Sequence, residues 1–338
     1  MKNKPTLQDV ADSAGVSTAT VSRCLNTPDL VKASVREKIN QTIQQLGYVP
    51  HGAARALASK RTRSIGVIVP TIDNAIFAEA IQALQRGITE ANYTLLLASS
   101  EYSLTEELRS VNSLLSRGVD AIVLVGEDHA PEVISAIELH QIPYVNLWIY
   151  NQESHYSCIG FDNVDAGEQL AKHLTQLGHH NIAIISGFIE NNDRALQRIN
   201  GARNHFEANG KRLTTFIECK YSIDKGKAAM HTIMKEHPET TAVFCGNDIL
   251  AIGAMAAARD LGLTVPEDIS ISGFDNIEIA SALDKPLTTI SVPAKAMGLE
   301  AARYLLESIG KGGQTLQHIE LKATLIIGET TAKPANER

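Results

Sequence analysis

The sequence has few cysteines, no long apolar run and no cluster of histidines. Its four cysteines are far apart and include no Cys-x-x-Cys pair, so neither a disulfide framework nor a metal site is expected. No stretch approaches the roughly eighteen consecutive apolar residues of a membrane-spanning helix, and polar residues stand where a secretory signal would be apolar. We therefore expect a cytoplasmic protein with reduced cysteines, no bound metal and no membrane partner.

Motifs of nucleotide-dependent enzymes are also missing. There is no Gly-x-Gly-x-x-Gly after a predicted strand, no Gly-x4-Gly-Lys-Ser/Thr, and no convincing set of nucleophile, base and acid. Asp275 with His179 or His180 is an imaginable catalytic pair, but a histidine in a surface turn is the simpler interpretation. We expect neither an enzyme nor a cofactor, and an enzyme that uses a nucleotide stays as an alternative.

Length and charge indicate more than one domain. The 338 residues are 44% hydrophobic and 20% charged, which describes a globular protein with a sizeable core and two or three domains. The net charge of −7 is unevenly distributed: residues 1–63 hold ten Lys/Arg and four acids (+6), and the remainder holds 21 and 34 (−13). A basic N-terminal module on an acidic body suits phosphate binding by one end of the protein.

The densest local pattern lies near the N-terminus and predicts two short helices joined by a tight turn. Thr6, with Asp9 three residues later, has the pattern of a helix N-cap. Ser17 and Thr20 repeat it after Gly15, which can adopt a positive φ. Apolar residues recur on the inner side of both segments: Leu7, Val10, Ala11, Ala14, Val16, Val21 and Leu25.

The outer side of the second segment carries short hydrogen-bonding groups, one small apolar residue and one guanidinium. These residues are Thr18, Ala19, Thr20, Ser22, Arg23 and Asn26. Such a surface suits insertion into the major groove of DNA, where side chains contact base edges. The alternative is an ordinary helical pair in a small bundle, with Arg23 and Asn26 simply solvated.

Residue identities as well as spacing distinguish these two interpretations. The run D-V-A-x-x-A-G-V-S-x-x-T-V-S-R-x-L-N, from Asp9 to Asn26, closely resembles the DNA-binding headpiece of the lactose repressor and purine repressor family. The resemblance implies a helix-turn-helix headpiece over residues 1–49 that reads a near-palindromic operator in double-stranded DNA. The residues it assigns to DNA are Thr6, Ser17, Thr18, Ala19, Thr20, Ser22, Arg23, Asn26, Tyr48, Ala54 and Leu57.

A third helix and a hinge complete the expected N-terminal module. Val35, Ile39, Ile43 and Leu46 recur at helical spacing before Gly47, although Lys32 stands where the family usually has a serine N-cap. Residues 50–63 resemble the family's hinge helix and linker. The resemblance makes Leu57 a wedge between base pairs in the minor groove, whereas the alternative is a plain linker with an exposed leucine.

From Ser64 onward, short apolar segments alternate with amphipathic ones. The expected strands include residues 65–69, 93–97, 121–125, 182–185, 215–218, 242–244 and 269–271. This alternation predicts an α/β core of two doubly wound parallel sheets, with ligands beyond the carboxyl ends of the strands.

The core also resembles that family, through Gly160-Phe161-Asp162-Asn163 and the segments 241–248 and 262–270. The resemblance implies a core like periplasmic sugar-binding proteins over residues 64–338. Its first lobe takes about 64–161 and 292–321, and its second about 162–291 and 322–338. The expected effector residues are Phe77, Trp148, Asp193, Arg194, Arg198, Asn247 and Asp275. Asp193 and Arg194 are included because they lie in the same loop as Arg198 and can add charge-assisted contacts.

These effector assignments differ in kind. Phe77, Arg198, Asn247 and Asp275 match family positions, whereas Trp148 stands where many relatives have aspartate. A tryptophan in place of aspartate removes a carboxylate that could accept hydrogen bonds from ligand hydroxyl groups, and supplies an aromatic ring on which a ligand can stack. The alternative roles for these residues are helix capping and packing.

Together these features predict a ligand-responsive transcriptional repressor. A sugar, sugar acid or nucleoside between the lobes would control operator binding allosterically. No leucine heptad follows the last expected strand, and a palindromic site calls for two-fold symmetry, so we expect a homodimer. The remaining alternative is a cytoplasmic small-molecule-binding protein that does not bind an operator.

Overall fold

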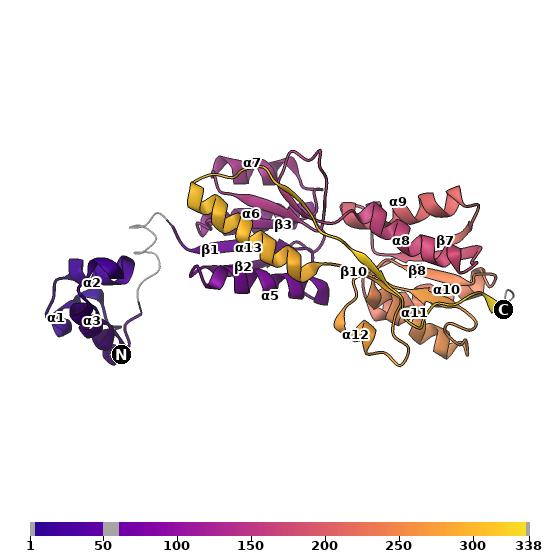
Figure 1. Ribbon diagram of the computed structural model, residues 1–338, viewed down its shortest axis with the longest axis horizontal. Helices are drawn as coiled ribbons and strands as arrows, with labels where there is room; N and C mark the ends of the chain where they lie inside the picture. Colours follow the sequence, from indigo (N-terminus) through magenta and orange to yellow (C-terminus); the bar gives the residue numbers. More distant parts are fainter. Residues whose placement is uncertain (1–3, 50–60, 336–338) are drawn as a thin grey trace. The chain divides into compact units, whose positions relative to one another are not determined.

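The computed structural model describes residues 4–49 and 61–335, and the chain divides into two compact units, residues 1–63 and 64–338 (Figure 1). Each unit is described by itself. The predicted contact residues Ala54 and Leu57 lie outside the described residues.

The N-terminal unit is helical. Its elements are α1 (Leu7–Ala14), α2 (Thr18–Asn26), the 3-10 helix η1 (Pro28–Leu30) and α3 (Ala33–Leu46). Thr6 and Asp9 form a reciprocal capping box at α1, and Gly15 ends that helix with a φ of 64°. The buried core residues are Val10, Ala11, Ala14, Val21, Cys24 and Ile39. The predicted helix-turn-helix is therefore confirmed.

The third helix differs from its prediction in which side chain it buries. Leu46 is exposed, whereas Thr42 is buried and its hydroxyl donates to the carbonyl of Lys38 at 2.9 Å. A hydroxyl bonded inside its own helix can be buried without an unpaired polar group. As the sequence indicated, Lys32 at the N-cap of α3 gives no side-chain cap.

The first half of the C-terminal unit is built on a sheet of six parallel strands, in the order β11-β5-β4-β3-β1-β2 among the described residues. The strands are β1 (Ser64–Val69), β2 (Thr94–Ser99), β3 (Ala121–Val125), β4 (Tyr144–Leu147), β5 (Cys158–Gly160) and β11 (His318–Glu320). Its helices are α5 (Ala75–Thr89), α6 (Leu104–Ser116), α7 (Pro131–Leu139) and α13 (Ala294–Lys311). We call this sheet with its helices lobe 1.

Alternating side chains of the lobe 1 strands cover its two faces. Val67 and Val123 pack in one cluster with α5 and α13, while Ile68 and Ile122 pack in another with α6 and α7. The strands are therefore apolar on both faces, which explains why their sequences are continuous hydrophobic runs.

The second half, lobe 2, contains a four-stranded parallel sheet in the order β7-β6-β8-β9 within residues 61–335. Its strands are β6 (Asn181–Ser186), β7 (Arg212–Glu218), β8 (Ala242–Cys245) and β9 (Ser270–Ser272). Its helices are α8 (Asn163–Gln176), α9 (Asp193–Ala208), α10 (Ile223–Glu236), α11 (Asp248–Asp260) and α12 (Glu278–Ser281). The predicted pair of doubly wound parallel sheets is confirmed.

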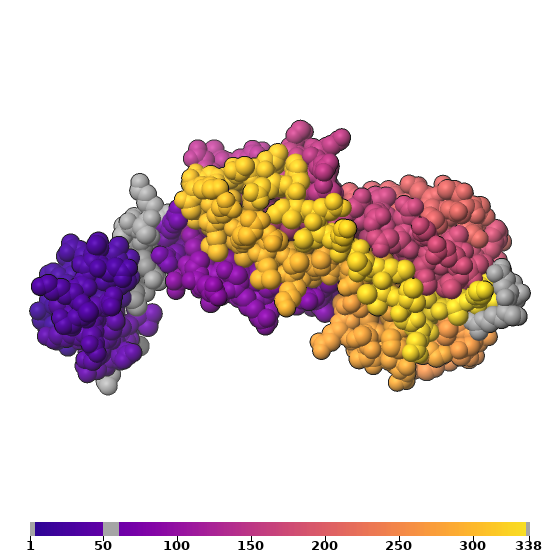
Figure 2. All heavy atoms as spheres, viewed as in Figure 1, coloured from indigo at the N-terminus to yellow at the C-terminus, as the bar shows by residue number. Residues whose placement is uncertain are grey.

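The chain passes between the lobes after β5, after β10 (Thr289–Ser291) and after β11, and β10 pairs antiparallel with β12 (Thr324–Ile326). Figure 2 shows the segment that follows α13, in yellow, running over the surface of both lobes. In the part of the chain that the structure describes, no helix is long and apolar enough to span a bilayer.

Candidate functional site

The outward side of α2 is a row of exposed and half-buried polar groups. Ser17 caps the helix by accepting the N–H of Thr20 at 3.2 Å, and the two hydroxyl oxygens lie 2.9 Å apart. One turn later, Asn26 Nδ2 donates to Ser22 Oγ at 3.3 Å. Ala19, Arg23 and Asn26 are exposed, whereas Thr18, Thr20 and Ser22 are half-buried. The predicted base-reading residues thus share one surface, and Ser22 among them is bonded to Asn26 of the same helix.

Two further residues that sequence reasoning assigned to DNA have structural roles in this unit. The exposed Thr6 forms the capping box of α1, and Tyr48 is half-buried against the small core just after Gly47. Both lie at ends of helices.

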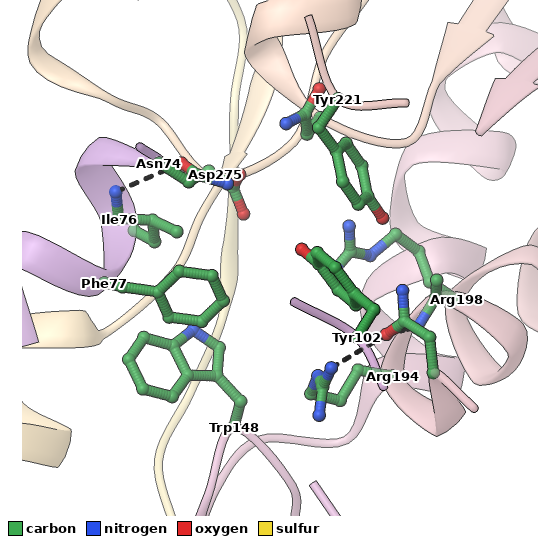
Figure 3. A pocket seen from close by; sticks show the side chains of 12 residues that line it. Asn74, Ile76, Phe77, Tyr102, Trp148, Arg194, Arg198, Tyr221 and Asp275 are labelled. Atoms are coloured by element: carbon green, nitrogen blue, oxygen red, sulfur yellow. Dashed lines mark hydrogen bonds between the residues drawn. The ribbon is translucent and has the colours of Figure 1, made fainter. Parts of the chain in front are cut away.

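A pocket lies between the two lobes, at the carboxyl ends of their strands (Figure 3). Its volume is about 30 Å³, room for about two water molecules. Six of the seven predicted effector residues line it: Phe77, Trp148, Arg194, Arg198, Asn247 and Asp275. The others that line it are Asn74, Ile76, Tyr102, Asn192, Ala195 and Tyr221.

Phe77 and Trp148 form an aromatic wall on the lobe 1 side of the pocket (Figure 3). Their ring centroids are 4.9 Å apart at an interplanar angle of 65°, an edge-to-face contact. Trp148 has a φ of 64°, and its carbonyl accepts the Nδ2–H of the buried Asn163 at 2.8 Å. A bulky residue in the left-handed region is strained, and such strain is typical of binding sites.

Arg198 reaches the pocket from α9 on the lobe 2 side. Its backbone packs so closely on α8 that a Cβ at Gly167 would clash with the Arg198 carbonyl oxygen. Its guanidinium lies 3.5 Å from the ring centroid of Phe274, and Nη1 donates to the carbonyl of Gly246. Nε is buried and has no hydrogen-bond partner among the described residues. Arg198 therefore presents a cationic edge with an unused donor.

Asp275 supplies a buried carboxyl group. Its backbone N–H donates to the carbonyl oxygen of Ile290 at 2.9 Å, and this hydrogen bond helps to hold its φ at 111°. Burial raises the pKa of Asp275 to about 8, against the lowering effect of nearby Arg198, and the Asp248 carboxylate raises it further. At neutral pH the carboxyl group of Asp275 is therefore mostly protonated and can donate a hydrogen bond.

Asn247 caps α11, and that role fixes the direction of its amide. Oδ1 accepts the N–H of Leu250 at 2.9 Å, while the buried Nδ2 has no hydrogen-bond partner within residues 61–335. Asn74 and Asn192 likewise cap α5 and α9 and line the same pocket. Three helix N-termini, each with a partial positive charge, thus face one cavity.

Asp193 is the exception among the predicted effector residues, because it does not line the pocket. Asp193 Oδ2 instead accepts the N–H of Glu127 in lobe 1 at 2.7 Å. Arg194 Nη1 also crosses to lobe 1, donating to the carbonyl of Val125 at 2.6 Å, and lies 3.3 Å from Asp193 Oδ1. The start of α9 is therefore tied to the loop after β3, and this contact uses the Asp193 carboxylate.

Sequence reasoning missed two aromatic residues of the pocket. Tyr102 follows β2 in lobe 1, Tyr221 follows β7 in lobe 2, and their ring centroids are 6.0 Å apart. A Cβ at Gly187 would clash with the Tyr221 ring, so glycine gives this ring its place. Their position after strands of parallel sheets was the signal that could have found both residues.

The expectation of a surface histidine at position 179 is wrong. His179 is 1% exposed, and its ring nitrogens lie 2.9 Å from Thr241 Oγ1 and 3.0 Å from Ser270 Oγ. Thr241 directly precedes β8 and Ser270 begins β9, so both partners lie at the amino ends of these strands. Asp275 follows the opposite, carboxyl end of β9. The imagined pair of Asp275 with His179 is therefore not assembled.

Comparison with known proteins finds two matching families. Residues 6–51 match "Bacterial regulatory proteins, lacI family", and residues 171–331 match "Periplasmic binding protein-like domain". The chain is 32% identical over 329 residues to the HTH-type transcriptional regulator GntR of Escherichia coli K12, covering 97% of this chain and 98% of GntR. It is also 32% identical over 308 residues to catabolite control protein A of Priestia megaterium, covering 90% and 93%.

A solved structure extends the similarity to the whole fold. The lac repressor dimer bound to operator and the anti-inducer ONPF has a TM-score of 0.85 and 26% sequence identity. The comparison covers 98% of this chain and all of the lac repressor chain.

Proposed function

Because this chain belongs to the lacI family of bacterial regulatory proteins, a family of DNA-binding transcriptional regulators, we propose that it represses transcription under the control of a small effector. In this proposal the headpiece, residues 1–49, reads a near-palindromic operator. Residues 50–63 form the hinge, and residues 64–338 bind the effector and dimerise. The site of action is the cytoplasm, where the operator DNA lies.

The DNA-binding part of the proposal is supported by the outward side of α2. Thr18, Ala19, Ser22 and Arg23 lie on one surface, and Arg23 has no carboxylate partner within 4.0 Å in residues 4–49 and 61–335. An exposed, unpaired guanidinium beside short polar groups suits contact with guanine edges and phosphates. We assign Leu57, by its resemblance to the family's wedge, to the minor groove.

The effector-binding part is carried by one observation: six residues chosen from the sequence, from both lobes and the connection between them, line a single cavity. A sugar, sugar acid or nucleoside bound there contacts both lobes and thereby changes the balance between lobe arrangements. Linkage then requires that effector and operator alter each other's affinity by the same factor.

The dimer part rests on similarity to the lac repressor, whose dimer is bound to operator in its crystal structure. A two-fold dimer presents two α2 helices to two half-sites, which matches a near-palindromic operator. The proposal gives the pocket no catalytic step, since its groups are explained by binding.

Selection of DNA from a random pool with the full-length protein, followed by fluorescence anisotropy of the enriched sequence, tests the proposal. We expect a palindromic site bound in a salt-dependent manner, and about a 10- to 100-fold loss of affinity in Arg23→Ala. Arg109→Ala, in an exposed lobe 1 ion pair with Glu106, is the matched control and keeps the affinity. Failure to enrich any sequence would refute operator binding and leave a small-molecule-binding protein.

A further inference from the structure

Two adjacent residues at the start of α9 bind the lobe 1 loop that follows β3. Asp193 Oδ2 accepts the N–H of Glu127 at 2.7 Å, and Arg194 Nη1 donates to the carbonyl of Val125 at 2.6 Å. The two bonded peptide groups lie on either side of Gly126. We call these five residues the clamp, because side chains of lobe 2 bind the backbone of lobe 1 at two neighbouring points.

Glycine at position 126 allows the two side chains to come this close. The φ of Gly126 is 88°, and a Cβ there would clash with Arg194 Nη1 and Asp193 Oδ1. Its N–H donates to the carbonyl of Leu147 at 2.9 Å, and its carbonyl oxygen lies 3.0 Å from His129 Nε2. The lobe 1 half of the clamp is therefore held in place by lobe 1 itself.

The clamp is buried and charge-assisted. The side chains of Arg194 and Asp193 are 9% and 15% exposed, and Arg194 Nη1 lies 3.3 Å from Asp193 Oδ1. Arg194 Nη2 also donates to Asn192 Oδ1 at 2.9 Å, which fixes the guanidinium on its own helix. Hydrogen bonds to charged groups are about twice as strong as neutral ones, and a low local dielectric strengthens them further. The clamp therefore favours the arrangement of the lobes in this structure, which we call closed.

The clamp joins parts of the two lobes that are distant in sequence from the connections between them. The chain passes between the lobes after β5, β10 and β11, whereas the clamp follows β3 in lobe 1 and begins α9 in lobe 2. The contact of Asn163 with the carbonyl of Trp148, in contrast, adjoins the connection after β5. Rotation of the lobes about the connections therefore has to break the clamp.

Opening of the lobes also affects the pocket, because Arg194 of the clamp lines it (Figure 3). The pocket has room for about two water molecules, so a larger effector enters only when the lobes move apart. Trp148 lines the same pocket and is 5% exposed. Access of an effector and exposure of Trp148 thus both depend on lobe opening.

We propose that the clamp is a regulatory contact that keeps the lobes closed and thereby sets the affinity of the protein for its operator. Breaking the clamp shifts the population toward the open arrangement, which admits effector more readily and binds operator with a different affinity. This inference rests on the proposed function, since it identifies how the same pocket is regulated.

The first test needs neither operator nor effector. Trp148 is the single tryptophan, so quenching of its emission by acrylamide measures lobe opening in the full-length protein. We expect Asp193→Ala and Gly126→Ala to raise the quenching constant at least about twofold, because each breaks the clamp. Asp193→Asn keeps an oxygen that can accept the Glu127 N–H, so its quenching constant should lie closer to that of the wild type.

Two controls match these substitutions. Asp165, like Asp193, is an acidic residue in the first turn of a lobe 2 helix, but its carboxylate accepts Gln169 Nε2 of the same helix at 2.6 Å. Gly210, like Gly126, has a positive φ, with open space where a Cβ would stand. We expect Asp165→Ala and Gly210→Ala to keep the quenching constant within about 1.3-fold of the wild type.

The second test measures operator binding of the same variants by fluorescence anisotropy, with the sequence that the wild type selects. We expect both clamp variants to change the operator affinity at least about fivefold and in the same direction, because they shift the same equilibrium. The two controls should stay within about twofold of the wild type. Thermal unfolding by circular dichroism identifies any misfolded variant, and if Gly126→Ala is misfolded, Asp193→Ala alone decides.

The outcomes separate this inference from the function on which it rests. Unchanged quenching in the folded clamp variants, or equal increases in the controls, overturns the clamp. Increased quenching with unchanged operator affinity, or affinity changes in opposite directions, overturns its regulatory role. If the wild type selects no operator, the proposed function fails and the regulatory role fails with it, while quenching still decides whether the clamp holds the lobes closed.

Discussion

The outward side of α2 and the pocket between the lobes differ in how their polar groups are satisfied. On α2 the polar side chains are exposed or half-buried, and several bond to one another, as Asn26 does to Ser22. In the pocket, Arg198 and Asn247 are buried with unused donors, and Asp275 has a raised pKa. Water reaches the first surface freely, whereas the second is buried and carries donors that no protein group pairs among the described residues. Substitutions on α2 should therefore alter binding alone, and substitutions around the pocket should also alter stability.

The largest effect on the free energy of unfolding is expected beside the pocket, where α8 packs on α9. Because a Cβ at Gly167 clashes with the carbonyl oxygen of Arg198, we expect Gly167→Ala to lower the free energy of unfolding by about 3 kcal/mol or more. Gly310→Ala, in α13 with open space around it, is the matched control and should raise it by up to about 1 kcal/mol. Urea denaturation measures both. Equal effects of the two substitutions would contradict the close packing described.

The second-largest effect is a dependence of the free energy of unfolding on pH, which arises in the pocket and not on α2. The folded-state pKa of Asp275, about 8, is well above its unfolded value of about 3.9. Between these values the folded protein holds a proton that the unfolded chain has lost, so stability falls as pH rises, by about 1.4 kcal/mol per unit. We expect Asp275→Asn to remove roughly 2–3 kcal/mol of this loss in unfolding free energy between pH 5.5 and 7.5.

Urea denaturation of both proteins at the two pH values measures this difference. Burial also raises the pKa of Asp248 to about 7, but Asp248 is present in both proteins. Parallel stability curves for the wild type and Asp275→Asn would show that the Asp275 carboxyl is not protonated in the folded state.

The smallest effect on stability is expected on α2. Exchanging Thr18 and Ala19 together for other small polar residues should change the preferred operator sequence. The relative affinity for the two sequences should change by about 10- to 100-fold per altered base pair. The free energy of unfolding should stay within about 0.5 kcal/mol, because Ala19 is exposed and Thr18 half-buried. Gln45→Ala, exposed on α3, is a control for general effects on the headpiece. Selection from a random pool that returns the wild-type site would remove both residues as base readers.

Much of the fold was predictable because it depends on local rules. The capping box at Thr6, the left-handed Gly15 and the buried parallel strands follow from residue type and spacing. Residue identity also located most of the pocket, since Phe77 and Arg198 stand at positions matched from the sequence.

What could not be predicted depends on side-chain direction and on contacts distant in sequence. Asp193 and Arg194 are adjacent and both bond to the backbone of lobe 1, yet only Arg194 lines the pocket. Tyr102 and Tyr221 come together only when the lobes are in place. His179 is buried because Thr241 and Ser270, far away in sequence, supply its partners.

The measurement that tests the central claim most directly is a reciprocal titration. The dissociation constant of the effector, read from Trp148 emission, is measured with and without saturating operator, and that of the operator, read from anisotropy, with and without saturating effector. The account predicts two ratios that differ from one and equal each other, because effector and operator bind one coupled protein. Two ratios of one would show that the pocket and α2 act independently, and would contradict effector control of transcription.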